Sequence, residues 1–331
     1  MKMARIRIEP DMLAIILTDQ CNAQCSMCCF GCSPYNKNVA DEETVVTLIK
    51  QAAQMQNIKK VGFSGGEAFL QFELLKKMTK LASDLGLKTS CTTNGFWATS
   101  YEKAEEKLLE LKQSGIGKIG LSMDHFHQKY IDIKCIKRIL EICKKLSIPV
   151  DVGSVITKET SDLSEYLKVL KDDLVNVPHY RAACLPIGKA ENIAKQDLYY
   201  EEGLLNNPVK CYELTYFSVY LNGDVYPCCS QAGVQQALKL GNIKKDSLKD
   251  LLDKYRMNMH IRMLKKYGFA WYLDKAEKEG FVKIFKRKYV NKCDLCHLLF
   301  NDKIYLESIS KYIECEKQLI YRKYLAEQES K

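Results

Sequence analysis

Three cysteines in one short loop, Cys21, Cys25 and Cys28, have the spacing of a metal-binding turn. In the segment CNAQCSMC these cysteines are separated by three and then by two residues. Because iron–sulfur clusters are held by cysteine thiolates, one tight loop of this kind could wrap three corners of a cubane. The fourth iron would then have no protein ligand and could bind a small chelating molecule. The alternative is a structural zinc site, which prefers paired CxxC knuckles some distance apart.

Four further cysteines come from three separate segments: Cys211, Cys228, and the CxxC pair Cys293 and Cys296. Together they offer four thiolates to a second metal centre, and the CxxC pair alone would also allow a zinc ribbon. Cys229 directly follows Cys228. Side chains of adjacent strand residues point to opposite faces, so we expect Cys229 not to bind the same centre.

The remaining thiols are interpreted by their surroundings. The chain has fifteen cysteines and no secretory signal, which disfavours disulfides and favours metal binding where thiols cluster. Cys29 and Cys32 are extra thiols of the first loop, without an assigned role. Four single cysteines in apolar patterns are expected in the core: Cys91, Cys135, Cys143 and Cys184.

The composition, 47% hydrophobic and 27% charged over 331 residues, is that of an ordinary globular protein. The N-terminal apolar stretch is too short for a signal peptide, and no run reaches the roughly 18 apolar residues of a membrane span. We therefore expect a cytoplasmic protein without a membrane partner. The net charge of +9 is spread over Lys-rich stretches such as 74–80 and 283–288. These charges serve as solvated surface or attract an acidic partner; no basic stripe with interleaved aromatic residues favours nucleic acid.

The elements that must position these thiols alternate between strands and helices. Strands are expected over 13–18, 60–64, 88–94, 118–124, 149–157 and 179–186, and helices over 42–56, 69–85, 101–114, 128–146 and 161–172. This alternation predicts parallel strands with right-handed crossovers, so the fold class is α/β with a partial (β/α)6 TIM-like barrel. Functional groups should gather at the C-terminal ends of its strands. The first cysteine loop, GGE (65–67), TTNG (92–95) and SMD (122–124) all follow or end expected strands.

A polar stretch around 190–210 marks the expected domain boundary. We expect the barrel over 1–200, a small second domain over 201–302 and a helical tail over 303–331, which could brace the barrel. In the second domain two alternating apolar runs flank Asn222-Gly223, which predicts a hairpin with a type I′ turn.

The first cysteine loop, together with Gly65, Gly66 and Glu67, resembles the radical S-adenosylmethionine (SAM) superfamily. The resemblance implies that Cys21, Cys25 and Cys28 hold a [4Fe–4S] cluster whose open iron binds the amino and carboxylate groups of SAM. It implies that the GGE backbone and Glu67 hold the amino group. Reduction by the cluster then cleaves the sulfonium to a 5′-deoxyadenosyl radical. Independently, glycines at a strand end permit close approach of backbone to a ligand.

The same resemblance implies that Asn94, Ser122 and Asp124 contact the nucleoside. Polar caps at strand ends would look the same at Asn94. The family commonly has an aromatic residue before its third cysteine, and Met27 stands there in this chain, which leaves the adenine contact open.

The second set of cysteines resembles the twitch or shortened SPASM domain, which carries an auxiliary [4Fe–4S] cluster. The resemblance implies that Cys211, Cys228, Cys293 and Cys296 bind that cluster. A full SPASM domain would have another cysteine where this chain has Asp302, so two clusters in total are expected.

Seven segments together resemble the radical SAM peptide epimerases that make epipeptides: CNAQCSMCCFGCSP, FSGGEAFL, TNGFW, SMDHFHQKY, LNGDVYPCCS, KKYGFAWYL and CDLCHLLF. The resemblance implies that a ribosomally made precursor peptide has L-residues converted to D-residues, with the second cysteine of the PCC pair, Cys229, returning the hydrogen atom. It also implies an electron donor such as flavodoxin or ferredoxin. About a dozen residues precede the first expected strand, so no N-terminal peptide-recognition domain is expected.

Two other interpretations stay open. A related maturase would oxidise the substrate radical to a thioether or carbon–carbon crosslink. A non-catalytic metal-binding module would hold zinc in place of iron. His125 and His127 lie on a strand-to-helix loop without a GxSxG motif nearby, so they line the active site or belong to a merely polar loop.

Overall fold

The computed structural model describes residues 9–206 and 210–329, with side chains to residue 322. The described strands form one nine-stranded sheet in the order β6-β5-β4-β3-β2-β1-β7-β8-β9. Pairs from β6 to β7 are parallel, whereas β7, β8 and β9 pair antiparallel. The strands are β1 Met12–Ile16, β2 Lys60–Ser64, β3 Lys88–Thr93, β4 Lys118–Ser122, β5 Val150–Ile156, β6 His179–Ala183, β7 Tyr216–Val219, β8 Asp224–Tyr226 and β9 Gly241–Asn242.

Helices connect the parallel strands and build the C-terminal part. The α-helices are α1 Glu42–Gln54, α2 Phe72–Asp84, α3 Tyr101–Gln113, α4 His125–Gln128, α5 Ile133–Leu146, α6 Ser164–Leu170, α7 Leu248–Met257, α8 Met259–Lys266, α9 Phe269–Lys278, α10 Val282–Lys286, α11 Lys292–Asn301 and α12 Lys303–Glu329. Short 3-10 helices are η1 Ala68–Gln71, η2 Lys171–Leu174, η3 Gly188–Asn192, η4 Lys195–Asp197, η5 Gln231–Gly233 and η6 Gln236–Leu238.

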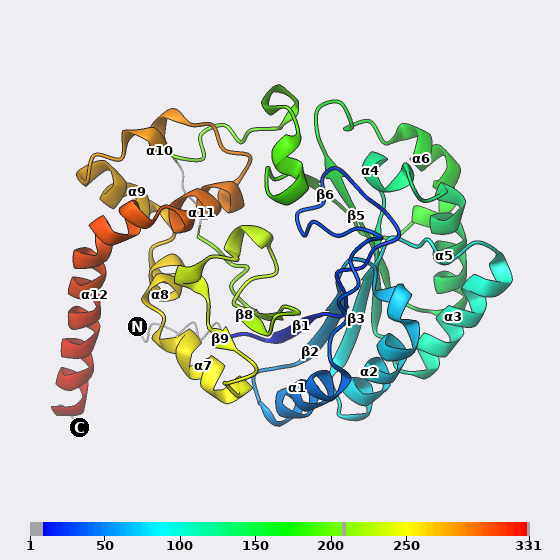
Figure 1. Cartoon of the computed structure of the whole chain (residues 1–331), viewed down its shortest axis with the longest axis horizontal. Helices are drawn as coiled ribbons and strands as arrows, with labels where there is room; N and C mark the ends of the chain where they lie inside the picture. Colours follow the sequence, from blue (N-terminus) through cyan, green and yellow to red (C-terminus); the bar gives the residue numbers. More distant parts are fainter. Residues whose placement is uncertain (1–8, 207–209, 330–331) are drawn as a thin grey trace.

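Helices α1, α2, α3, α5 and α6 cover the outer side of a curved sheet, and the C-terminal helices face its inner side (Figure 1). The six parallel strands with their crossovers confirm the predicted partial barrel. The expected helix over 128–146 begins later, at Ile133, because the Asp132 carboxylate accepts a hydrogen bond from the Lys134 N–H at 2.9 Å and caps α5, while residues 125–128 form the separate short helix α4. Buried apolar residues such as Ile136 and Ile139 then seat α5 against the sheet.

The second part of the chain continues the same sheet. Strand β7 pairs in parallel with β1, with Tyr216 opposite Met12, and the β7–β8 hairpin follows as predicted. The predicted type I′ turn is wrong, because Gly223 takes a φ of 88° while Asn222 does not take a positive φ. The Asn222 side chain accepts a hydrogen bond from the Asp224 N–H at 3.0 Å, so an Asx turn closes a longer loop.

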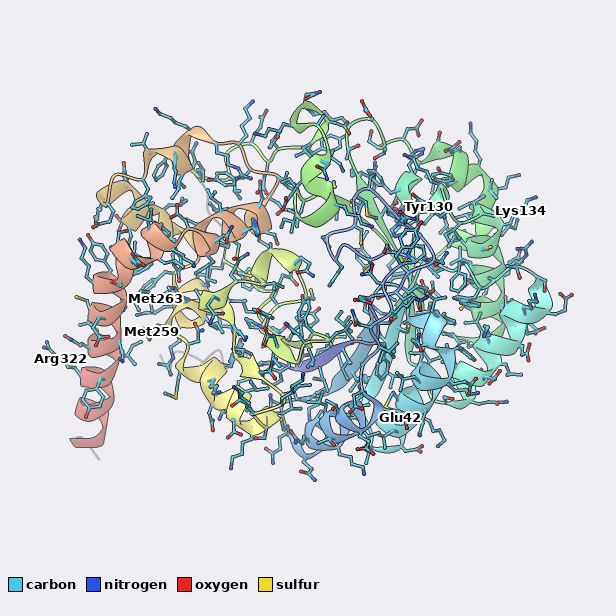
Figure 2. All side chains as sticks on the ribbon, in the orientation of Figure 1. Glu42, Tyr130, Lys134, Met259, Met263 and Arg322 are labelled. Atoms are coloured by element: carbon cyan, nitrogen blue, oxygen red, sulfur yellow. The ribbon has the colours of Figure 1, made fainter. Side chains whose placement is uncertain are left out.

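The tail helix α12 packs against α8, α9 and α11, at the outer edge of the C-terminal part (Figure 1). Tyr305 and Ile309 are fully buried there, and the Tyr305 hydroxyl donates to the Tyr272 carbonyl at 2.7 Å. Figure 2 shows Arg322, near the other end of α12, pointing away from the molecule. The buried residues of this tail contact the C-terminal helices, and whether it also braces the barrel stays a prediction.

The described helices include none that is both long and apolar enough to cross a bilayer. The division into domains at 1–200, 201–302 and 303–331 stays a prediction. One continuous sheet runs across the expected boundary between the first two domains.

Two substitutions in α12 test how it is anchored. We expect Ile309→Ala to lower the free energy of unfolding by about 2–5 kcal/mol, because Ile309 is fully buried. Leu319→Ala is the matched control, since Leu319 is 51% exposed and alanine is an equally good helix former. Thermal unfolding should show a lower Tm for the first variant only; equal shifts in the two would contradict this packing.

Candidate active site

The first cysteine loop is bound to the end of β2 by main-chain hydrogen bonds. The Gly66 N–H donates to the Thr18 carbonyl at 2.7 Å, and the Glu67 N–H donates to the Gln20 carbonyl at 2.8 Å. A Cβ atom would lie 2.3 Å from the Thr18 carbonyl oxygen at Gly65 and 2.1 Å from the Gln20 carbonyl oxygen at Gly66. The close approach that these glycines permit is therefore to the cysteine loop itself.

The Glu67 carboxylate joins β2 to β3. It is almost fully buried and accepts hydrogen bonds from the Phe69 N–H (3.0 Å), the Thr93 hydroxyl (2.7 Å) and the Asn94 N–H (2.7 Å). Burial raises the pKa of Glu67, and the three donors oppose that rise. The sequence did not single out Thr93; its place one residue before Asn94 in the TTNG run was the available signal.

One cavity of about 220 Å³ brings most of the predicted cofactor residues together. Its walls come from the cysteine loop and from the C-terminal ends of β2, β3, β4 and β5, as the barrel fold predicts. Its lining includes Cys21, Cys25, Cys28, Gly65, Gly66, Glu67, Asn94 and Ser122 from the predicted set, and Met27, Cys29, Phe30, Cys32, Thr93 and His127 besides. We call it the loop cavity.

Five thiols of the loop line this cavity. Burial raises the pKa of Cys21 to about 11 and that of Cys25 to about 12. The pKa of Cys28 is lowered to about 5, chiefly by a hydrogen bond from the buried Cys32 thiol. Which of the five bind iron stays a prediction, with Cys21, Cys25 and Cys28 favoured by their spacing.

Asn94 fastens the end of β3 to the cysteine loop. Its side-chain amide donates to the Asn22 oxygen at 2.9 Å and lies 3.8 Å from the Cys21 sulfur. Its own oxygen accepts from the Phe96 N–H at 3.0 Å. Asn94 is therefore a polar cap at the end of β3, and it also lines the loop cavity.

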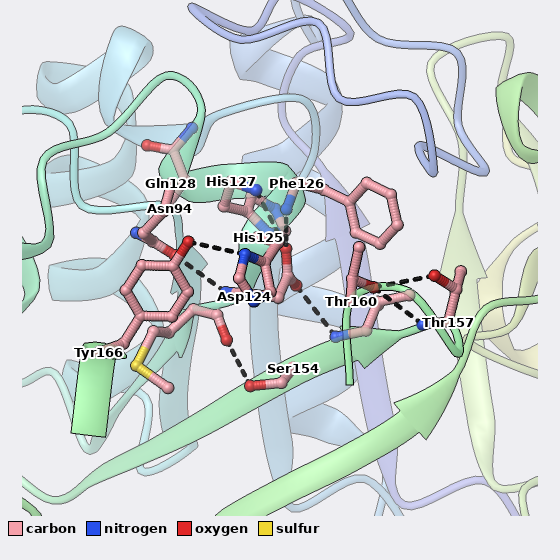
Figure 3. A network of polar contacts seen from close by, with 12 residues as sticks. Asn94, Asp124, His125, Phe126, His127, Gln128, Ser154, Thr157, Thr160 and Tyr166 are labelled. Atoms are coloured by element: carbon pink, nitrogen blue, oxygen red, sulfur yellow. Dashed lines mark hydrogen bonds and ion pairs between the residues drawn. The ribbon is translucent and has the colours of Figure 1, made fainter. Parts of the chain in front are cut away.

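Asp124 lies behind the cavity wall. It is fully buried, and its carboxylate accepts hydrogen bonds from the main-chain N–H groups of Phe126, His127 and Val155 at 2.9–3.0 Å. Its Oδ1 atom also lies 2.9 Å from His127 Nδ1. Figure 3 shows these contacts converging on the start of α4. Asp124 therefore caps α4 and ties it to β5, and the side chain that reaches the cavity is His127.

A second, smaller cavity is lined by all four predicted auxiliary ligands, Cys211, Cys228, Cys293 and Cys296. Cys293 and Cys296 lie one turn apart on α11, whose start is capped by Asn291, the acceptor for the Cys293 N–H at 2.8 Å. Cys228 is buried and its sulfur accepts from the Ser230 N–H at 3.3 Å. Thiols from three distant segments thus meet here.

Asp302, at the position of the missing SPASM cysteine, has a structural place instead. Its carboxylate accepts from the Tyr305 N–H at 3.0 Å at the start of α12 and lies 2.6 Å from the Lys283 ammonium.

The donor sets fit clusters of several iron atoms. In the described part of the chain, no three Cys, His, Asp or Glu side chains converge closely enough for a single metal ion. A zinc ion needs every sulfur at about 2.3 Å, whereas a cubane is wider and its thiolates stand farther apart. Each predicted set of cysteines lines a cavity of its own, which suits the larger group.

Cys229 opens into a third cavity, of about 220 Å³, inside the barrel. Inward-facing residues of β1, β2, β3 and β7 line it, among them Ala14, Gly62 and Ser218. It shares Phe30, Ser64 and Thr92 with the loop cavity, so the two adjoin. We call it the barrel cavity.

Cys228 and Cys229 follow β8 instead of lying within it, so the expected strand alternation is not what separates them. They nevertheless line different cavities. Hydrogen bonds with the Cys228 thiol and the Tyr216 hydroxyl lower the pKa of Cys229. Tyr216, which the sequence did not single out, lines the barrel cavity with it.

Cys91, Cys135, Cys143 and Cys184 are all buried, as predicted for core residues.

Two family models match the chain. A model of the radical SAM superfamily matches residues 15–170, and a model of the iron–sulfur cluster-binding SPASM domain matches residues 211–297. Among curated proteins, "Putative peptide biosynthesis protein YydG" of Bacillus subtilis (strain 168) is 26% identical over 306 residues, 91% of this chain and 96% of that protein. GTP 3′,8-cyclase of Aquifex aeolicus (strain VF5) is 23% identical over 296 residues, 74% of this chain and 90% of that protein.

Solved structures share the fold. "Native anSMEcpe with bound AdoMet" has a TM-score of 0.58 at 18% identity and covers 91% of this chain and 98% of its own. The same protein with bound AdoMet and Cp18Cys peptide has a TM-score of 0.56 at 18% identity, with 94% and 99% covered.

Replacing Gly66 tests the contact between β2 and the cysteine loop. We expect Gly66→Ala to lose about half of the bound iron, because only the loop cavity depends on this contact and the auxiliary thiols lie elsewhere. Gly153→Ala is the control, since a Cβ at Gly153 would meet only the Leu121 carbonyl oxygen, at 4.0 Å. Iron and sulfide per chain after anaerobic reconstitution measure the effect; full iron content in Gly66→Ala would contradict it.

Proposed function

We propose that this chain, which belongs to the radical SAM superfamily and carries an iron–sulfur cluster-binding SPASM domain, is a peptide epimerase that converts L-residues of a precursor peptide to D-residues. The family, the enzyme class, and the iron–sulfur and SAM cofactors predicted from the motifs are confirmed by the two family models. Epimerisation, the residues that carry it and a single auxiliary cluster are the proposal.

The observation that carries the proposal is the location of the Cys229 thiol. Cys229 lies in the barrel cavity, which adjoins the loop cavity, while Cys228 beside it lines the auxiliary cavity. A thiol hydrogen is thereby available in a cavity that adjoins the one lined by the predicted cofactor residues. A substrate carbon held between the two cavities would face a hydrogen acceptor on one side and a hydrogen donor on the other.

The relatives support a peptide substrate. The relative from Bacillus subtilis is named for peptide biosynthesis, and it matches 91% of this chain. The GTP 3′,8-cyclase of Aquifex aeolicus, named for a nucleotide, covers less of the chain. The anSMEcpe structure with bound peptide shares the fold of this chain.

In the proposed reaction Cys21, Cys25 and Cys28 would hold the cluster, and the ends of β2 and β3 would hold SAM. When bound, these cofactors would supply the 5′-deoxyadenosyl radical chemistry needed for loss of the α-hydrogen from an L-residue. The resulting peptide radical is planar at Cα and has lost its handedness. Cys229 breaks its S–H bond and gives the hydrogen atom to the opposite face, which fixes the D configuration. The protein's part is to orient the groups and to exclude water.

Each turnover leaves Cys229 as a thiyl radical, which needs one electron and one proton to recover. The neighbouring residue, Cys228, lines the auxiliary cavity, so an iron–sulfur centre there would lie close to the sulfur to be reduced. A flavodoxin or ferredoxin remains the predicted external donor.

The competing reaction is crosslink formation, in which the substrate radical is oxidised and not quenched. That reaction has no use for a thiol facing the substrate. The Cys229 thiol in the barrel cavity therefore favours epimerisation.

The first test removes the thiol. Cys229→Ala should leave SAM cleavage within about twofold of wild type while abolishing D-residue formation, because hydrogen abstraction does not need the sulfur. Candidate precursor peptides, synthesised from any short reading frames that flank the gene, serve as substrates, with 5′-deoxyadenosine and D-amino acids measured after hydrolysis. Cys143→Ala, a buried cysteine of α5, is the matched control. D-residues formed normally by Cys229→Ala would overturn the proposal.

The second test follows the returning hydrogen. Thiol hydrogens exchange with water, so in deuterated water each converted residue should gain about one deuterium at Cα. Mass spectrometry measures this directly. A crosslinked product would instead lose two hydrogens and gain no deuterium at Cα, which would favour the competing reaction.

A further inference from the structure

The two histidines of α4 face different surroundings. His125 has both ring nitrogens engaged, Nδ1 at 3.0 Å from the Tyr166 hydroxyl and Nε2 at 2.5 Å from the Asp162 carbonyl. His127 lines the loop cavity instead. Figure 3 shows His125 beside Tyr166 and His127 above the Asp124 carboxylate.

The contact with Asp124 fixes which nitrogen of His127 carries the proton. Asp124 Oδ1 accepts from the main-chain N–H groups of Phe126 and His127 and lies 2.9 Å from His127 Nδ1. A carboxylate oxygen that accepts hydrogen bonds needs a donor at Nδ1. In a neutral imidazole the other nitrogen, Nε2, then has a lone pair and is an acceptor.

Asp124 is itself held rigidly. It is fully buried, and its second oxygen accepts from the Val155 N–H of β5 at 2.9 Å. The imidazole is thus fixed through one carboxylate to both α4 and β5. The hydrogen bonds from the main-chain N–H groups of Phe126 and His127 are enough to cap α4. The contact of Asp124 with the His127 ring is therefore additional to the helix cap.

His127 lines the loop cavity and is not in the lining of the barrel cavity. The loop cavity contains His127 and the cysteines, and the adjoining barrel cavity contains Cys229 and Tyr216. Ser122 and Asn94 line the loop cavity with His127, at the ends of β4 and β3. A hydrogen-bond acceptor in this position suits a hydroxyl donor of the nucleoside.

We propose that His127 Nε2 accepts a hydrogen bond from a ribose hydroxyl of SAM, and that Asp124 is its positioning residue. Asp124 therefore acts on the nucleoside through His127 and not by direct contact. The proposal rests on the cofactor cavity of the proposed function, but not on epimerisation.

Binding of S-adenosylhomocysteine tests the proposal without turnover, because this molecule has no sulfonium to cleave. The reconstituted full chain is titrated anaerobically with it. His127→Ala should raise the Kd about tenfold, the effect of one lost hydrogen bond in a desolvated site. His125→Ala is the matched control and should stay within twofold of wild type, because both ring nitrogens of His125 are engaged by Asp162 and Tyr166 and His125 is not in the lining of the loop cavity.

Three further measurements separate a direct contact from a structural effect. The 2′,3′-dideoxy analogue of S-adenosylhomocysteine should bind His127→Ala and wild type equally, since the partner hydroxyl is missing. His127→Gln should recover a large part of the affinity through its amide oxygen. Asp124→Asn should match His127→Ala, with Tm and iron content reporting whether it folds.

Unchanged affinity in His127→Ala would overturn the proposal, and so would equal losses of affinity in His127→Ala and His125→Ala. The proposal would also fail if His127→Ala weakened binding of the dideoxy analogue as much as it weakens binding of S-adenosylhomocysteine. If instead wild type makes no D-residues, the proposed function fails while these binding results stand.

Discussion

The active site depends on one contact, the main-chain pairing of Gly65–Glu67 with Thr18–Gln20. It places the cysteine loop on the end of β2 at a distance that no Cβ would allow. The Glu67 carboxylate then accepts hydrogen bonds from Thr93 and Asn94 at the end of β3. Its burial has an energetic cost, which is seen in the raised pKa of Glu67. Without this pairing the five loop thiols would have no fixed relation to the strand ends that complete the cavity.

The second constraint is that the sheet is continuous. Because β7 pairs with β1 in register, the hairpin that carries Cys228 and Cys229 is fixed to the same framework as the cysteine loop. The Phe30 ring of the loop stacks with Tyr220 at the end of this hairpin, with centroids 6.4 Å apart. The loop and barrel cavities therefore adjoin through contacts within one packed unit, and not across a movable junction.

Sequence patterns predicted most of the fold, since apolar runs and their spacing directly reflect burial. The strand 60–64 was predicted to the residue, and the four predicted auxiliary thiols, which are spread over residues 211–296, line one cavity. The misses depend on single backbone or side-chain conformations. Whether Asn222 takes a positive φ, or Asp132 starts a new helix, is decided by local hydrogen bonds that leave no periodic trace. Thr93 and Tyr216 are common residue types whose importance comes only from what folding brings beside them.

His125 and His127 also differ only through local hydrogen bonds that the sequence pattern does not show. They are two positions apart on a helix of four residues, and residue type and spacing treat them alike. What distinguishes them is that Tyr166 and Asp162 occupy the ring nitrogens of one, whereas Asp124 holds one nitrogen of the other and directs its ring to the cavity. The Glu67 carboxylate is likewise occupied by hydrogen bonds from Thr93, Asn94 and Phe69. In such a site the side chains most saturated by internal hydrogen bonds build the cavity, so ligand recognition falls to the groups that they orient.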